Sequence, residues 1–104
     1  MRFSILLVDD EESIRDGVAI ALGPLYDIRA FGTAEEGLAS LDEKPPDLVL
    51  LDIGLPGMNG IEALRRIRET HPEVLVIMIT AYEDVHTVVS AMKLGAYDYI
   101  IKPI

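Results

Sequence analysis

Short apolar runs alternate along the chain with segments in which apolar residues recur at helical spacing. The runs are rich in β-branched and aliphatic residues and lack polar alternation, which is typical of strands buried on both faces of a parallel sheet. Each gap between runs is long enough for one helix. The five predicted strands are Ser4–Val8, Asp27–Phe31, Asp47–Leu51, Val74–Ile79 and Tyr97–Ile101.

Four helices are predicted between these strands. The second begins with a capping box, in which Thr33 and Glu36 each bond the other residue's exposed amide. The third begins after Asn59, a favoured N-cap, and the fourth follows Asp84 and ends with Gly95 at C′. The predicted inward faces are Ile14, Val18 and Leu22; Ala34, Leu38 and Leu41; Ile61, Leu64 and Ile67; and Val85, Val88, Val89 and Met92, while Arg65, Arg66, Arg68 and Glu69 are expected to face water.

The order of these elements indicates the fold. Strand–helix alternation predicts right-handed crossovers, with helices on both faces of the sheet. Five strands at this spacing predict an α/β, flavodoxin-like fold with a doubly wound parallel sheet of order 2-1-3-4-5. A fifth helix would normally cover the last strand, and the sequence ends at Ile104. We therefore expect residues 1–104 to be one domain, truncated after the fifth strand, with the final helix missing from this chain.

Composition narrows the class of protein. The 104 residues are 50% hydrophobic, enough for a core, and carry a net charge of −9, which disfavours direct binding of nucleic acid. Without cysteines there are no disulfides or thiolate metal sites, which fits the cytoplasm. No apolar run approaches the roughly 20 residues that span a bilayer, and no signal peptide is evident, so we expect no membrane association.

Polar residues whose side chains can bind a ligand or react follow several of the predicted strands. Asp9 and Asp10 close the first strand, Asp52 the third and Thr80 the fourth, and Lys102 follows the fifth. In an open parallel sheet, ligands bind outside the carboxyl ends of the strands, at the switch point between strands one and three. Acids, a hydroxyl and an ammonium group are therefore expected at one edge.

Each of these residues also has an ordinary explanation. Asp10 could cap the first helix, and Asp52 could begin a turn. Thr80 could be a strand residue without a function, and Lys102 a solvated surface lysine. Taken singly these explanations are favoured, whereas the joint placement favours a site.

Converging carboxylates predict a cation and a reaction. They repel one another, so we expect raised and coupled pKa values. Mg²⁺ suits such oxygen ligands together with a phosphate oxygen, and Asp52 could then attack phosphorus as a nucleophile. The transferring group spreads charge over three equatorial oxygens, for which Mg²⁺, Lys102 and the Thr80 hydroxyl are suitable partners.

Four motifs resemble the receiver domain of two-component response regulators, and the resemblance covers essentially the whole chain. The stretch from Thr80 to Pro103 is most similar to receivers of σ54-dependent (NtrC-like) transcription activators. The motifs are LLVDDE at 6–11, LVLLDIGLPGMNG at 48–60, IMITAY at 77–82 and GAYDYIIKP at 95–103.

The resemblance implies roles at the site. Asp52 would accept the phosphoryl group, Asp10 and the Gly54 carbonyl would bind Mg²⁺ directly, and Asp9 would act through a bound water. Mn²⁺ or Ca²⁺ could substitute for Mg²⁺. Lys102 would pair with the phosphate, and its bond to Pro103 is expected to be cis.

The resemblance also implies a switch and its partners. Thr80 would move to the phosphate and Tyr99 would rotate inward, altering the face of helix four and strand five. The implied partners are a sensor histidine kinase, a C-terminal output domain outside this chain, and a second copy bound through helix four and strand five. Gly54 and Tyr82 offer no group to position water, which predicts slow self-dephosphorylation.

Three alternatives remain open. A Mg²⁺ phosphohydrolase with an aspartyl nucleophile would commonly carry an acid where Gly54 stands. A flavin or nucleotide carrier would need a small-residue anion loop after strand one, where this chain has four acids at 9–12. A degenerate receiver used only for assembly would not need the complete set of site residues.

Overall fold

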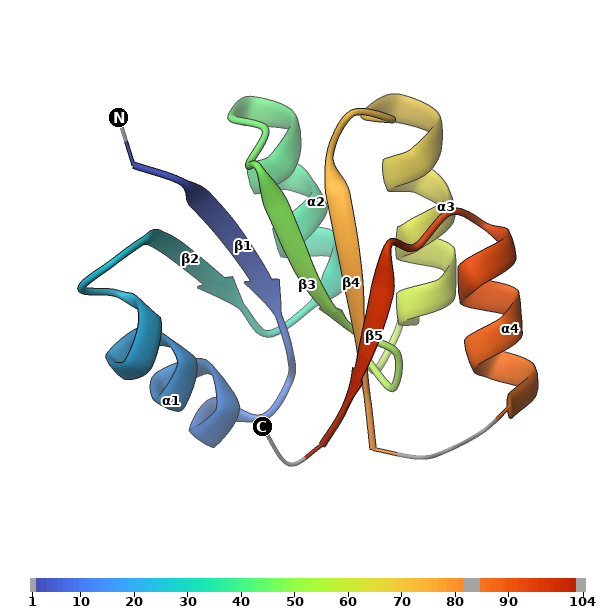
Figure 1. Cartoon of the computed structure of the whole chain (residues 1–104), viewed down its shortest axis with the longest axis horizontal. Helices are drawn as coiled ribbons and strands as arrows, with labels where there is room; N and C mark the ends of the chain where they lie inside the picture. Colours follow the sequence, from blue (N-terminus) through green and yellow to red (C-terminus); the bar gives the residue numbers. More distant parts are fainter. Residues whose placement is uncertain (1, 82–84, 103–104) are drawn as a thin grey trace.

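A five-stranded parallel sheet of order β2-β1-β3-β4-β5 forms the centre of the molecule, which is a computed structural model describing residues 2–81 and 85–102 (Figure 1). The order confirms the predicted doubly wound, flavodoxin-like fold. The elements along the chain are β1 Ser4–Val8, α1 Glu12–Leu22, β2 Asp27–Phe31, α2 Ala34–Glu43, β3 Leu48–Asp52, α3 Gly60–Thr70, β4 Leu75–Thr80, α4 Val85–Lys93 and β5 Asp98–Ile101.

Helices cover both faces of the sheet, as Figure 1 shows: α1 lies on one side, and α2, α3 and α4 lie on the other. Because successive side chains of a strand point to opposite faces of the sheet, the strands contribute to two apolar clusters, one on each face. The cluster under α1 contains Ile5, Leu7, Leu50 and Ile79. No helix in the described ranges is both long enough and apolar enough to cross a membrane.

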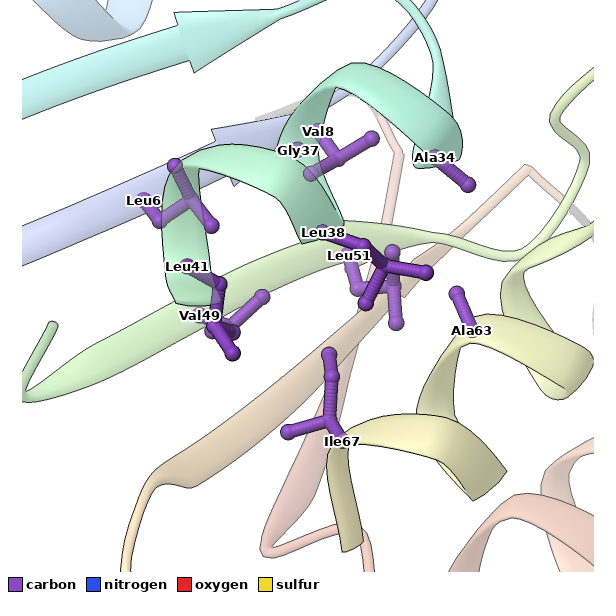
Figure 2. Close-up of a pocket in the computed structure, with 10 residues that line it drawn as sticks. All are labelled: Leu6, Val8, Ala34, Gly37, Leu38, Leu41, Val49, Leu51, Ala63 and Ile67. Atoms are coloured by element: carbon purple, nitrogen blue, oxygen red, sulfur yellow. The ribbon is translucent and has the colours of Figure 1, made fainter. Parts of the chain in front are cut away.

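The cluster under α2 is closely packed, and Figure 2 shows its side chains meeting between β1, β3, α2 and α3. Ala34, Gly37 and Leu41 are the buried residues of α2, and Leu38 is half-buried. A Cβ atom on Gly37 would lie 2.6 Å from Val8 Cγ2, so glycine is what allows α2 to approach β1 this closely.

The predicted helix starts are largely confirmed. Thr33 Oγ1 accepts a bond from Glu36 N at 3.1 Å, and Asn59 Oδ1 accepts one from Glu62 N at 3.0 Å. The capping box differs in one bond, because the Glu36 carboxylate accepts from the Thr33 hydroxyl and not from its amide. Gly95 follows α4 with φ +104°, a conformation that favours glycine. The start predicted at Asp84 lies outside the described residues.

Three predicted strands have boundaries shifted by one residue. Strands β3 and β4 begin later than predicted and end on Asp52 and Thr80, and β5 begins at Asp98. The prediction followed hydrophobic runs, whereas a strand is defined by its ladder. Asp52 pairs with Ile79 in that ladder, although its side chain is polar.

The predicted inward face of α4 is partly wrong. Val89 and Met92 are exposed, while Ala91 is buried and Leu94 packs against the same cluster. The small side chain of Ala91 lets the helix approach the sheet with a face rotated away from the larger residues. The side chain of Val85 lies outside the described part of the chain.

Arg68 is also placed differently from the prediction that it faces water. It is half-buried, and its Nη1 donates to the Val74 carbonyl at 2.9 Å. The long aliphatic part of arginine can cover apolar surface while its end finds a backbone acceptor.

On α1, the predicted face of Ile14, Val18 and Leu22 is only half-buried. These residues border an open groove of about 340 Å³ that Ile100 of β5 also lines. The face of the sheet beside α1 is therefore less covered than the face beside α2.

Candidate functional site

Parallel pairing brings the predicted residues to one edge of the sheet. Val8 and Leu51 are the last pair of the ladder between β1 and β3, so the residues that follow them, Asp9 and Asp52, lie next to each other at the end of that ladder. On the other side of β3, the Ile53 amide donates to the Ile79 carbonyl at 2.9 Å, which keeps β3 against β4 beyond Asp52.

The same pairing continues to the fifth strand. Thr80 pairs with Ile101, and the Lys102 amide donates to the Thr80 carbonyl at 2.7 Å. Lys102 is therefore fixed at the end of β4 by its backbone. From there its side chain reaches back toward β1 and β3.

Three aspartates converge at this edge. Asp9, Asp10 and Asp52 each offer a carboxylate oxygen, and the three oxygens lie within 4.8 Å of one another. Asp9 is 0% exposed and Asp52 is 4% exposed, whereas Asp10 is exposed. The alternative in which Asp10 serves only as a helix cap is wrong, because the N-cap of α1 is Glu11, whose own side chain makes no capping bond.

Hydrogen bonds to nearby residues fix both the side chain and the backbone of Asp9. Its Oδ1 accepts from the Glu11 amide at 2.9 Å, and its backbone carbonyl accepts from Arg15 Nη1 at 2.8 Å. Its buried Oδ2 lies 3.0 Å from Lys102 Nζ, an ion pair without the angles of a hydrogen bond. That oxygen still has electron pairs free for a cation.

Lys102 is surrounded by carboxylates. Its Nζ lies 3.0 Å from Asp9, 3.2 Å from Glu11 and 3.4 Å from Asp52, and its side chain is 10% exposed. Burial alone would lower the pKa of Lys102, but the nearby carboxylates of Asp9 and Glu11 and the charge of Asp52 raise it above its ordinary value. The ammonium group therefore stays charged at neutral pH.

Asp52 experiences opposing influences. Burial and the negative charge of Asp9 raise the pKa of its carboxyl, while the Gly54 amide, 3.1 Å from Oδ1, and Lys102 lower it. The net direction is upward, as expected for converging carboxylates. A divalent cation would favour the ionised form of Asp52 and reverse this direction.

Asp10 and Asp52 line an open pocket of about 320 Å³, with Thr80, Gly54, Glu11 and Lys102 also at its wall, while the buried Asp9 lies behind it. Thr80 is buried except for a small part of its surface. The pocket thus combines carboxylate oxygens, a hydroxyl and an ammonium group. Mg²⁺ prefers oxygen ligands and is usually bound by one or two carboxylates together with water. The carboxylate oxygens at this site therefore fit a hard divalent cation.

Gly60, the first residue of α3, fixes the backbone of Asp52. A Cβ atom at this position would overlap the Asp52 carbonyl and lie 2.7 Å from Ile53 Cα. The Gly60 amide also donates to the Ile53 carbonyl at 3.1 Å. Gly60, Glu11 and Arg15 were not predicted as supports of the site, although the position of Glu11 directly after the acidic pair is a signal for its role.

Tyr99 lies away from the acidic edge. It is 41% exposed on β5 and pairs with Met78, so it shares a sheet face with Thr80 on the neighbouring strand. Tyr99 therefore lies on the strand next to that of Thr80, with its side chain partly exposed to solvent. Pro103 and Tyr82 lie outside the described residues, so the cis bond and the slow self-dephosphorylation stay predictions.

Comparison with known proteins points to one family. The response regulator receiver domain model matches residues 5–104. The DNA-binding transcriptional regulator NtrC of Salmonella typhimurium is 42% identical over 100 residues, which are 95% of this chain and 21% of NtrC. The DNA-binding response regulator MtrA of Mycolicibacterium paratuberculosis is 43% identical over 104 residues, which are 99% of this chain and 46% of MtrA. The chain thus spans less than half the length of these curated relatives.

Solved structures agree with the sequence comparisons. The receiver domain of NtrX from Brucella abortus has a TM-score of 0.88 and 43% identity, covering 96% of this chain and 86% of that one. A CheY-like receiver domain protein from Methanospirillum hungatei has a TM-score of 0.96 and 35% identity, covering 100% of this chain and 84% of that one. With a family match from residue 5 to residue 104 and the same fold in solved receiver domains, the chain belongs to the response regulator receiver domain family.

Proposed function

We propose that the chain is a signalling switch that accepts a phosphoryl group on Asp52 in a Mg²⁺-dependent reaction. The observation that carries this proposal is the convergence of three aspartates with Lys102 at one edge of the sheet, where Asp10, Asp52 and Lys102 line an open pocket. Membership of the receiver family supports a regulatory role rather than the turnover of a metabolite. The chain would catalyse only its own phosphorylation and dephosphorylation.

Asp10, Asp52 and the backbone carbonyl of Gly54 would bind Mg²⁺ directly, and Asp9 would bind it through a water molecule. Mn²⁺ or Ca²⁺ would use the same oxygen ligands. The cation supplies positive charge that keeps Asp52 ionised beside the other carboxylates and neutralises a phosphoryl oxygen. The fit is supported by the mutual distance of the three carboxylate oxygens, all within 4.8 Å.

In the transfer step, a carboxylate oxygen of Asp52 attacks the phosphorus atom of the donor. The bond from phosphorus to the donor's leaving group breaks, and an acyl phosphate remains on Asp52. A phosphohistidine of a sensor kinase is the proposed donor, and its imidazole leaves with the electron pair and takes up a proton. Lys102, held charged at 3.4 Å from Asp52, would pair with the phosphoryl oxygens, and the Thr80 hydroxyl would donate to another.

The response would run from Thr80 to Tyr99. A new dianion at the edge favours a Thr80 hydroxyl that turns toward it, and the vacated space can admit the ring of Tyr99 from the next strand. The outward position of Tyr99, on the same sheet face as Thr80, supports this order of events. The two arrangements must differ by only a few kcal/mol for the phosphate to reverse them.

The proposed partners lie outside the chain. The relatives NtrC and MtrA are DNA-binding regulators much longer than this chain, which supports control of a transcriptional output domain C-terminal to the receiver. The face formed by α4 and β5 would carry the change and could form a homodimer. Since the chain has no cysteines and a charge of −9, we propose cytoplasmic action without direct contact to DNA or membrane.

The test is incubation with Mg²⁺ and acetyl phosphate, followed by intact mass measurement. We expect the mass to rise by one phosphoryl group. We expect no such rise when Mg²⁺ is chelated before the donor is added, or in the Asp52→Ala variant. Asp16→Asn, which changes an exposed aspartate of α1, is the matched control and should keep full uptake. Unchanged uptake in Asp52→Ala, or repeated hydrolysis of small phosphate esters, would contradict the proposal.

A further inference from the structure

We propose that Glu11 is a positioning residue that keeps Lys102 at the phosphoryl site when a divalent cation occupies the aspartates. The inference rests on the proposed function and adds a residue to it. Glu11 lines the same pocket, and its carboxylate lies 3.2 Å from Lys102 Nζ. It does not belong to the group of three aspartates whose oxygens converge.

Lys102 has as many donors as it has carboxylates around it. An ammonium group has three N–H donors, and Lys102 faces three carboxylates, those of Asp9, Glu11 and Asp52. Two of these belong to the aspartate group. A cation bound there withdraws their negative charge from Lys102 and repels the ammonium group directly.

Of the three carboxylates, Glu11 is the one that the cation leaves available. Without it, the flexible four-carbon stem of Lys102 would let the strongly hydrated ammonium group move toward water. With it, the ammonium group keeps one partner at the pocket wall, next to the place where the phosphoryl oxygens arrive. Glu11 would thus act on the reaction through Lys102 without touching the phosphoryl group.

The backbone holds Glu11 in position for this task. Its amide donates to Asp9 Oδ1 at 2.9 Å, and its carbonyl accepts from the Ile14 and Arg15 amides at 3.1 and 3.2 Å. The N-cap residue is therefore fixed between the acidic pair and α1. Its side chain, 54% exposed, spans to a residue 91 positions later in the chain.

Glu12 provides a matched control. It carries the same charge one position later and is exposed in the first turn of α1. In the described part of the chain no ion pair joins it to Lys102. Replacing either glutamate by glutamine removes one negative charge near the pocket, but only one of the two replacements removes a partner of Lys102.

Two readouts test the inference: the rate of phosphoryl uptake from acetyl phosphate at saturating Mg²⁺, and the Mg²⁺ concentration that gives half of the rise in melting temperature. Relative to Glu12→Gln, we expect Glu11→Gln to slow uptake by about two- to fivefold, the range for a partly exposed ion pair. We also expect it to raise the half-effect concentration by a similar factor, since Lys102 would then rely on Asp9 and Asp52 and compete with the cation.

A double-mutant cycle makes the test specific. In a Lys102→Met background, Glu11→Gln should cause no further loss in either readout, because its route of action is gone. An equal loss with and without Lys102 would overturn the inference. So would a Glu11→Gln protein that matches Glu12→Gln while the unmodified chain takes up phosphate normally. An unmodified chain that takes up no phosphoryl group would instead overturn the proposed function itself.

Discussion

At the scale of a single residue, the surroundings of Asp52 make its ionised form unfavourable, although that form is the one that reacts. Its carboxylate is buried beside Asp9, and only the Gly54 amide and Lys102 oppose the resulting rise of its pKa. The ionised form needed for nucleophilic attack is therefore disfavoured in the absence of a cation. A position selected for stability alone would carry a neutral side chain.

This leads to a prediction for Asp52→Asn in Mg²⁺-free buffer. Because the pKa of Asp52 is raised above 3.8 in the folded state, its stabilising contribution is present below that pH and is lost as pH rises through the folded pKa. The variant should therefore melt at a higher temperature than the unmodified chain at neutral pH. The difference should shrink as pH falls through the raised pKa.

Thermal melts across the acidic range measure this difference, with Asp16→Asn as the exposed control. A variant that melts at a lower temperature at neutral pH would show that attraction to Lys102 outweighs burial and the charge of Asp9.

Gly60 gives a second prediction at this scale. Gly60→Ala would force a methyl group against the Asp52 carbonyl and Ile53 Cα. Because backbone must move to relieve this overlap, we expect a loss of stability of about 1–3 kcal/mol and slower phosphoryl uptake. Denaturant unfolding and intact mass report the two effects. Normal uptake with normal stability would mean that the start of α3 does not position Asp52.

At the scale of elements, two helices with a central glycine behave differently. Gly37 of α2 faces Val8, whose Cγ2 would lie 2.6 Å from an added Cβ atom, while an added Cβ on Gly17 of α1 would meet nothing within 4 Å. The same substitution therefore tests packing in α2 and helix propensity in α1.

We predict opposite signs for these two substitutions. Gly17→Ala should stabilise the chain by up to about 1 kcal/mol through helix propensity. Gly37→Ala should destabilise it by about 1–3 kcal/mol, because α2 must move away from β1. Urea unfolding of both variants measures the difference. Equal effects would contradict the tight packing that Figure 2 shows between α2 and β1.

For the whole molecule, the acidic edge links folding to cation binding. The unfolded chain cannot bring residues 9, 10 and 52 together, so a cation bound to them stabilises the folded state alone. At ten times its dissociation constant, Mg²⁺ should add about 1.4 kcal/mol, which raises the melting temperature of a domain this size by roughly 6–11 °C.

Melting curves with Mg²⁺ and with a monovalent salt of equal ionic strength test this expectation. Asp52→Asn should lose most of the Mg²⁺-dependent rise, and Asp16→Asn should keep it. An equal rise with the monovalent salt would assign the effect to screening of the net charge of −9 and not to a site.

Much of the architecture could be predicted because its signals are local. Apolar runs and helical spacing identified every element in the order in which it occurs, and Thr33, Asn59 and Gly95 marked helix ends through bonds or dihedral angles that involve near neighbours. Asp9, Asp10, Asp52, Thr80 and Lys102 could be assigned to one edge because all strands of a parallel sheet point the same way.

The errors arose where the answer depends on how elements pack. The inward face of α4 follows from Ala91, whose size permits a close approach, and not from the larger Val89 and Met92. Arg68 is half-buried because its guanidinium group can donate to the Val74 carbonyl. The ends of β3 and β4 follow the ladder and not the apolar run.

The sequence by itself determined the order of strands and helices, the family and the side chains available at the edge of the sheet, because periodicity, capping and motif spacing are properties of neighbouring residues. Only the tertiary structure decided which charges meet. The three contacts of Lys102 join positions 50 to 93 residues apart in the chain's numbering, with Glu11 at a separation of 91 and Asp52 at 50. Such distances are set by strand register and by the packing of α1 and α3 at the strand ends, which no local pattern records.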